Sequence, residues 1–308
     1  MKIPKFFPVG LAVLALASTA TAQTFFDAGI TLQSKTIDLG NAGRIYKWAA
    51  LSRDGNVSAT TSSNTSPANI DFDGNVGIWG SSANLYLSNS RIQGNVFIRT
   101  GGTTNFSGSG GLSGTISQNA ATNTILSTAA THIDTLSNNI NSLTKTTNFS
   151  LSGFMNNTPS ALTKIIAAGS GDNTSSINLT INGTVNNPLN NPIVLKLSDF
   201  ILNEGGGTQL TLVGTAMTKF IINVTGQFSL SGSADVLLSG GLLAGNVIFN
   251  STGSGGAGLG GASTLKGILI AKNGTASLSG ASTITGQVIG KTIALSGGSK
   301  IKKPVVSP

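Results

Sequence analysis

Short alternating runs of apolar and polar residues, separated by glycine-containing turns, make up most of this chain. In its first half a Gly-Asn-Val motif begins at Gly55, Gly74 and Gly94, and a related Gly-Thr-Ile begins at Gly114. Alternation with a period of two predicts β-strands, and glycine supplies the positive φ angles of tight turns. A repeat of about twenty residues predicts stacked coils, because one such unit cannot bury its own apolar side.

The same period returns near the C-terminus with a different motif. Ala-Ser-Thr begins at Ala262 and again at Ala281, and each copy continues to a Leu-Ser-Gly sequence. Stacking of these copies predicts a serine column and a threonine column, which we expect to form a binding face: Ser263, Ser282 and Ser299, with Thr264 and Thr283 beside them. The glycine-rich run 251–261 is expected to bulge out of its coil as a loop. Asn56, Asn75 and Asn95 are expected to form an amide ladder that stabilises turns.

One segment with a helical period interrupts the coils. Its apolar residues recur at intervals of three or four, which places them on one stripe of a helix: Leu126, Ala129, Ile133, Leu136, Ile140 and Leu143. Serine and asparagine, which are mediocre helix formers, fill the opposite side. We therefore expect a helix that is stabilised by packing along a β-face.

These patterns predict one mainly β domain, a solenoid of parallel-stacked coils of about 19–20 residues with one long α-helix packed against a β-face. Lys2 and Lys5 precede a short apolar run and a small-residue cleavage site, as in a secretory signal peptide. The predicted division is a signal peptide (1–22) followed by a single domain (23–301), made of an N-terminal cap (23–50), a first coil array (51–117), the side helix (118–147) and the remaining coils (148–301), with a basic tail (302–308). The cap and the tail are expected to cover exposed coil edges.

Composition narrows the classes of function. The chain has no cysteine, so disulfide frameworks and cysteine-containing zinc sites are excluded. Only 9% of residues are charged although the formal net charge is +8. The basic residues are scattered except for Lys300, Lys302 and Lys303, which we interpret as a solvated tail, so no nucleic-acid partner is predicted. No transmembrane segment is expected in the mature chain, and the sequence does not specify an oligomeric state.

Candidate chemistry is sparse. Asp71 and Asp73 are the one close pair of carboxylates, and Asp54 lies about one coil away. This cluster could hold calcium or act as a catalytic pair of a polysaccharide-active β-helix enzyme; a solvated coil edge is the alternative we favour. His132, the single histidine, flanks the helical stripe and is interpreted as a polar flank. No catalytic residue and no cofactor is therefore predicted, with calcium as the open alternative.

The order of these elements resembles a known family. A signal peptide, glycine-marked repeats and one striped helix are followed by Phe-Ile-Ile-Asn-Val-Thr-Gly at 220–226, Asn-Val-Ile-Phe-Asn at 246–250, and a long motif at 267–280. The chain looks like the choice-of-anchor A family of bacterial exported proteins, whose domain is related to ice-binding-like adhesive domains. The resemblance implies a right-handed parallel β-helix with one long α-helix packed along its side, and a role at the cell surface or in adhesion. It also implies a C-terminal anchoring tail, of which residues 302–308 show no sign, so free secretion or attachment through a partner is expected.

The leading hypothesis is a non-enzymatic, secreted or cell-surface, adhesin-like protein. It would present a rigid face rich in Ser, Thr and Asn to an extracellular polymer, matrix or cell surface. The alternative is an ice-binding protein of the antifreeze type, which needs a flat, regular β-face with small hydroxyl or methyl side chains.

Overall fold

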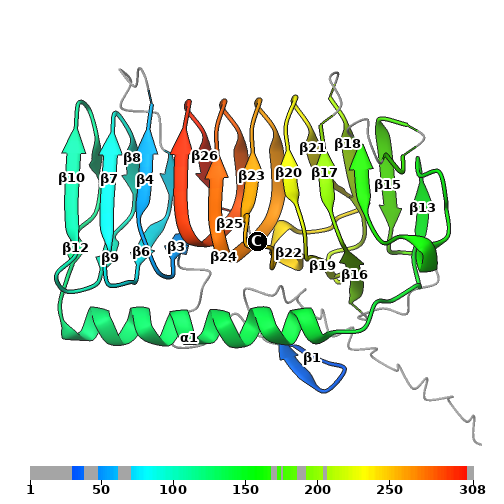
Figure 1. Ribbon diagram of the computed structural model, residues 1–308, viewed down its shortest axis with the longest axis horizontal. Helices are drawn as coiled ribbons and strands as arrows, with labels where there is room; N and C mark the ends of the chain where they lie inside the picture. The colour runs from blue at the N-terminus through cyan, green and yellow to red at the C-terminus, as the bar shows by residue number, and fades with distance from the viewer. Residues whose placement is uncertain are drawn as a thin grey trace, which may run out of the picture.

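The structure is a computed structural model that describes residues 30–37, 48–61, 71–167, 172–174, 176–185, 192–203 and 207–303. The predicted signal peptide and the tail beyond Lys303 lie outside the described residues. One continuous sheet winds into a three-sided parallel β-helix, and a single long helix lies along one side of it (Figure 1). The predicted fold class is confirmed.

The first side of the β-helix, which we call the first sheet, pairs its strands in parallel. From one end of the molecule to the other, the order is β10 (Thr103–Ser107), β7 (Asn84–Ser88), β4 (Val57–Thr60), the last part of β25 (Thr283–Ser296), the last part of β24 (Thr264–Leu278), β23 (Ala257–Leu259), β20 (Phe228–Leu230), β17 (Phe200–Leu202) and β14 (Ile165–Ala167).

The second sheet follows the same order of coils. It contains β11 (Gly111–Leu112), β8 (Arg91–Gln93), β5 (Phe72–Asp73), β26 (Lys300–Lys302), the first parts of β25 and β24, β21 (Asp235–Ser239), β18 (Gln209–Val213), β15 (Asn178–Asn182) and, antiparallel at the end, β13 (Ser150–Ser152).

The third sheet is the side that the helix covers. It contains β12 (Ile116–Ser117), β9 (Val96–Ile98), β6 (Asn75–Ile78), β3 (Trp48–Ser52), the middle parts of β25 and β24, β22 (Val247–Ser251), β19 (Phe220–Val224) and β16 (Ile193–Leu197). Strands β19 and β22 are buried throughout, because they face the coil interior on one side and the helix on the other.

The chain builds this stack in two arrays that meet in the middle. Strands β3 to β12 wind outward to one end, the helix returns along the third sheet, and strands β13 to β26 wind back from the opposite end (Figure 1). The last coil then stacks on the first, since β25 pairs with β3 and β4.

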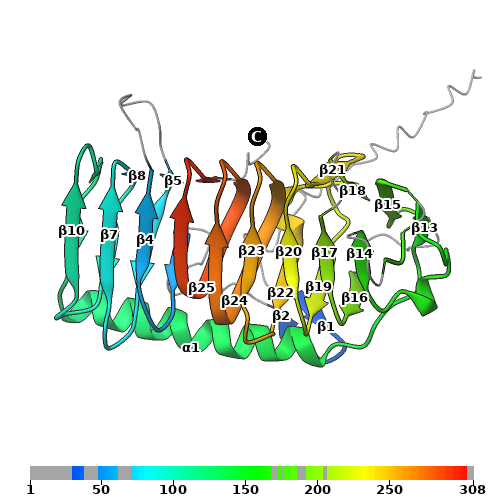
Figure 2. The same cartoon turned by 45° about the horizontal axis from the view of Figure 1, so that its top comes forward.

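This topology corrects two predictions about the ends. Strand β3, which includes the last residues of the predicted cap 23–50, lies between β25 and β6 inside the stack. The hairpin of β1 (Ile30–Leu32) and β2 (Lys35–Ile37) lies beside the helix (Figure 2). Lys300–Lys302 form β26, a strand between β25 and β5, rather than part of a solvated tail. The described parts of these two segments do not cover a coil end, because β3 and β26 are paired on both sides and the β1–β2 hairpin packs against the helix.

Helix α1 (Ala120–Ser142) forms within the predicted range 118–147. Asn119 caps it by accepting a hydrogen bond from the Thr122 amide. All six residues of the predicted stripe are buried against the third sheet, with the outward side chains of Val194, Ile221, Ile248, Ile268 and Ile289. No helix among the described residues is long and apolar enough to cross a membrane.

Polar contacts fix the position of the helix on the sheet. The Ser137 hydroxyl donates to Asn250 Oδ1 at 2.8 Å, and Asn250 Nδ2 donates to Asn223 Oδ1 at 2.9 Å. Asn223 Nδ2 in turn donates to the carbonyl of Ile140 at 2.8 Å. These side chains are fully buried, and their hydrogen bonds pair polar groups whose burial without a partner would destabilise the fold.

Candidate functional site

The predicted serine column lies inside the molecule and cannot form a binding face. Ser263, Ser282 and Ser299 are 0%, 0% and 1% exposed. Each hydroxyl donates to the carbonyl three residues earlier, at 2.6–2.7 Å, and so closes the turn between the first and second sheets. In that turn Gly280 and Ala281 both have left-handed φ angles, of 62° and 65°. The serine side chain therefore stabilises the turn by a local hydrogen bond to the backbone, as Ser hydroxyls commonly do.

The predicted threonine column is half-buried and lies among charges. Thr264 and Thr283 point outward from the second sheet, and their register continues to Asp235 on one side and Lys300 on the other. The neighbouring outward column contains Lys266, Thr285 and Lys302. The outer side of the second sheet therefore carries one carboxylate and three lysines around only a short run of threonine.

The three candidate calcium ligands are distributed over different corners of the β-helix. Asp54 follows β3 and pairs with Arg53 at 2.8 Å, whereas Asp73 pairs with Lys303 at 3.6 Å. Asp71 is buried and accepts the Arg91 amide at 2.7 Å. Within the described ranges no cluster of three or more His, Cys, Asp or Glu side chains has the spacing of a metal site. The structure therefore does not bring this predicted site together.

Burial changes the ionisation of Asp71. Desolvation raises the pKa of its carboxyl above 3.8, although the bond from Arg91 and the positive charge of Lys300 act in the opposite direction. Asp71 and Asp73 do not share an open groove, because the first is 1% exposed and the second lies at the surface. The geometry of a catalytic carboxylate pair is thus not present at these two residues.

The predicted asparagine ladder is formed by two of its three members. Asn75 Oδ1 accepts a hydrogen bond from the backbone N–H of Asn95, and Asn95 Oδ1 accepts one from the backbone N–H of Thr115, both at 2.9 Å. Asn56 instead accepts a bond from Asn84. The ladder ties successive coils together and is structural, as predicted.

The outer side of the first sheet has a different character. Following the strand register, one outward column crosses the middle of the stack as Ser58, Ala294, Ser277, Gly258 and Ser229. A second column contains Thr60 and Ser296. We call these seven residues the small-residue face. None of the strand segments of the first sheet contains a charged residue.

Strand geometry makes the small-residue face regular. Neighbouring coils are about 4.8 Å apart, and alternate residues along a strand are roughly 6.6 Å apart. The core beneath holds the backbone flat, since the inward residues of these strands, such as Val57, Ile293 and Leu278, are at most 1% exposed. Sequence reasoning missed this face because its members share no single motif.

A shallow hollow crosses the small-residue face at β23. The glycine-rich run 251–261 does not bulge out as predicted, but continues the coil with β23 and leaves few side chains on its surface. A hollow of about 550 Å³ results, with Gln227, Ser229, Ser254 and Ser277 on its walls. Its lining is neutral.

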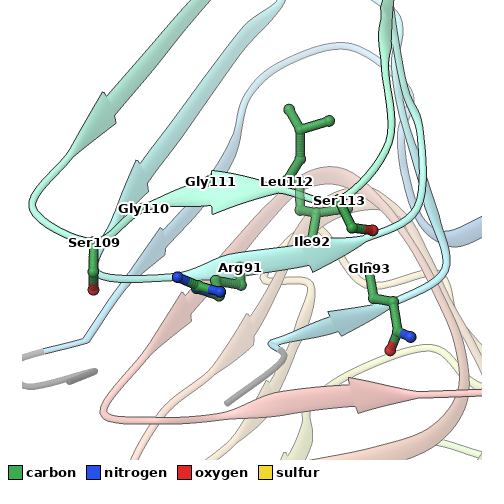
Figure 3. A pocket seen from close by; sticks show the side chains of 8 residues that line it. All are labelled: Arg91, Ile92, Gln93, Ser109, Gly110, Gly111, Leu112 and Ser113. Carbon is green, nitrogen blue, oxygen red and sulfur yellow. The ribbon is translucent and has the colours of Figure 1, made fainter. Parts of the chain in front are cut away.

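A second hollow, of about 350 Å³, lies on the outer side of the second sheet. Figure 3 shows Arg91 beside Gly110 and Gly111 and Gln93 near Ser113, with Leu112 pointing to the other side of its strand. The hollow is open at Gly111, where an added Cβ would meet no atom within 4 Å. It offers one guanidinium group and no carboxylate, so it resembles neither a metal site nor an acid–base site.

Together these features define a parallel β-helix with a long side helix, one flat neutral face and one charged face. No family model and no curated sequence matches this chain. Among solved structures, it is similar to an ice-binding protein from an Antarctic biological consortium, with 20% identity and a TM-score of 0.55 over 90% of this chain and 95% of that one. Ice-binding proteins from an Arctic yeast (14% identity, TM-score 0.49, 86% and 94% covered) and from the ascomycete Antarctomyces psychrotrophicus (19%, 0.49, 86% and 98%) also match.

The first of these likenesses shows that the chain has the fold of an ice-binding protein. The resemblance to the choice-of-anchor A family stays a prediction.

Proposed function

We propose that this chain is a secreted, non-enzymatic ice-binding protein, and that the small-residue face is the surface that contacts ice. The observation that carries the proposal is a flat, uncharged array of small hydroxyl and methyl side chains on one side of a rigid stack. The likeness to ice-binding proteins extends to the fold and supports this choice over the adhesin-like hypothesis. Both hypotheses use a passive, regular face and differ in the partner.

The chemistry of the face suits a solid, neutral partner. A regular array sums many weak contacts, and each hydrogen bond contributes about 1 kcal/mol net. Short side chains on a strand lose little rotamer entropy on binding, so the ordering cost is low. The charged side chains of the second sheet would retain their own hydration, and the third sheet is covered by α1. The first sheet is therefore the side that can lie against a crystal surface.

The proposal is tested by placing a bulky side chain on each exposed side. In Ser277→Tyr the ring would project from the middle of the small-residue face, whereas in Thr283→Tyr it would project from the second sheet. Thermal hysteresis and inhibition of ice recrystallisation would be measured on both variants and the parent protein. We expect Ser277→Tyr to lose most activity and Thr283→Tyr to retain it.

Two outcomes would overturn the proposal. A parent protein without activity at high concentration would exclude ice binding and return the adhesin-like hypothesis, which glycan and matrix arrays would then test. Activity lost in Thr283→Tyr but kept in Ser277→Tyr would move the site to the second sheet. Equal unfolding midpoints of the three proteins would show that the variants remain folded.

A further inference from the structure

The two ends of the β-helix are closed differently. At the end formed by β13, β14 and β16, residues after α1 fold over the core: Phe149, Phe154 and Leu162 are 4%, 2% and 2% exposed. Lys145 holds this cover in place, because its ammonium group donates to the carbonyls of Ser160 and Leu162. This end is capped by the chain itself.

The opposite end has no such cover among the described residues. Strands β10, β11 and β12 each pair on one side, with β7, β8 and β9. Phe106 and Ile116 occupy inward positions, since they align with the buried Leu87 and Val96. They are nevertheless 38% and 41% exposed, because no further coil covers them.

The backbone of β10 presents an open edge. The Thr103 amide donates to the carbonyl of Ala83, and the Ser107 carbonyl accepts from the Asn89 amide, so these groups point toward β7. In a parallel ladder successive residues point to opposite neighbours. The amides and carbonyls of Thr104 and Phe106 therefore point away from the stack.

This edge lacks the features that normally prevent pairing. Exposed edge strands usually carry lysine or another charged residue, or proline, which prevents a second chain from pairing with them. From Thr100 to Thr131 the sequence contains no Asp, Glu, Lys, Arg or Pro. The terminal coil is thus neutral in a chain whose formal net charge is +8, and it can meet an identical coil without direct like-charge repulsion.

We propose that this open end binds the same end of a second copy of the chain through a two-fold axis. With the axis at Asn105, β10 pairs antiparallel with β10 of the second copy, and the free groups of Thr104 meet those of Phe106 of the second copy. The open end presents three strand edges, those of β10, β11 and β12, arranged in a triangle. An extended peptide could pair with one of these edges, whereas a second coil of the same cross-section could meet all three, which favours a second copy.

The dimer would bury Phe106 and Ile116 and join the two cores. An axis perpendicular to the first sheet also places the two small-residue faces side by side in one plane. That consequence rests on the proposed function, whereas the dimer itself does not, so the two are tested by separate measurements.

The experiment is sedimentation equilibrium of the chain over a wide concentration range, with the variants Phe106→Lys and Ile116→Lys. Tyr86→Lys is the matched control, since Tyr86 is 40% exposed but points outward one coil away from the end. We expect a dimer in the parent protein and in Tyr86→Lys, and a dimer weakened roughly tenfold or more in the other two, because each would place a cation in an apolar contact. Circular dichroism of each variant checks that it remains folded.

Hydrogen exchange gives a second readout that needs no substitution. The amides of Thr104 and Phe106 should become protected as the concentration rises, while the amide of Asn105, which points toward β7, stays protected throughout. A monomer at every concentration would overturn the proposal. So would a dimer that persists unchanged in both lysine variants, or edge amides whose protection does not depend on concentration, which would indicate cover by the chain's own residues.

Discussion

The bonds between Ser137, Asn250 and Asn223 make a quantitative prediction about how the helix is attached. Asn250→Ala removes the acceptor of the Ser137 hydroxyl and the donor to Asn223 Oδ1, both of which are fully buried. Each buried group left without a partner costs about 1–3 kcal/mol. Since two groups are affected, we expect the free energy of unfolding to fall by roughly 2–6 kcal/mol.

Equilibrium unfolding in urea measures this change, provided that the m-values of the parent protein and the variant agree. Asn139→Ala is the matched control on the same helix: its side chain donates to the Thr36 carbonyl at an exposed site, so we expect a loss of about 0.5 kcal/mol or less. The double variant Ser137→Ala/Asn250→Ala should lose less than the sum of its single variants, because it removes both partners of one bond.

A loss below about 1 kcal/mol for Asn250→Ala would refute the reasoning that burial makes these bonds important. The same conclusion would follow if Asn139→Ala were equally destabilising, because exposed and buried amides would then be equivalent. Strict additivity in the double variant would show that Ser137 and Asn250 are not coupled.

Three further predictions concern the surfaces. Gly258→Ser should fold normally and raise ice-binding activity, because an added Cβ would meet the Ser277 hydroxyl at an ordinary 3.5 Å and would fill the gap in the small-residue face; reduced recrystallisation inhibition would contradict this. Calcium or a chelator should leave the thermal midpoint unchanged, because Asp54, Asp71 and Asp73 lie apart; a midpoint that rises with calcium would show a site. Burial raises the pKa of Asp71 in the folded state, so its contribution favours folding below pH 3.8 and is lost as pH rises through the raised value. Asp71→Asn should therefore be more stable than the parent protein at neutral pH. Urea midpoints of the two proteins that differ equally at all pH values would contradict this assignment.

The parts of the fold that depend on local pattern could be predicted from the sequence. The stripe from Leu126 to Leu143 predicts α1 and its buried side, and the repeat of about twenty residues predicts stacked coils. What the pattern does not contain is the order in which coils stack. Strand β3 pairs with β25, more than two hundred residues later, and no local signal connects them.

The proposed ice-contacting face was harder to predict, because alternation of apolar and polar residues specifies the two sides of a strand but not where the strand ends. In the Leu-Ser-Gly-Ala-Ser-Thr sequence at 278–283, the turn at Gly280 and Ala281 changes the direction of the chain. Ser282 then points into the turn and donates to Ser279, while Ser277 points outward from the first sheet. Two serines five residues apart therefore have opposite roles, and only the corner geometry separates them.

The same geometry explains why a repeated motif is a poor guide to a surface in this fold. A corner has to satisfy its backbone groups in every coil, so its residues recur in sequence as Ser263, Ser282 and Ser299. A flat outward column needs only to be small and uncharged, and Ser58, Ala294, Gly258 and Ser229 meet that requirement with three residue types. The strongest repeats thus mark what holds the coils together, whereas the proposed ice-contacting surface is recognised by the absence of charge along one sheet.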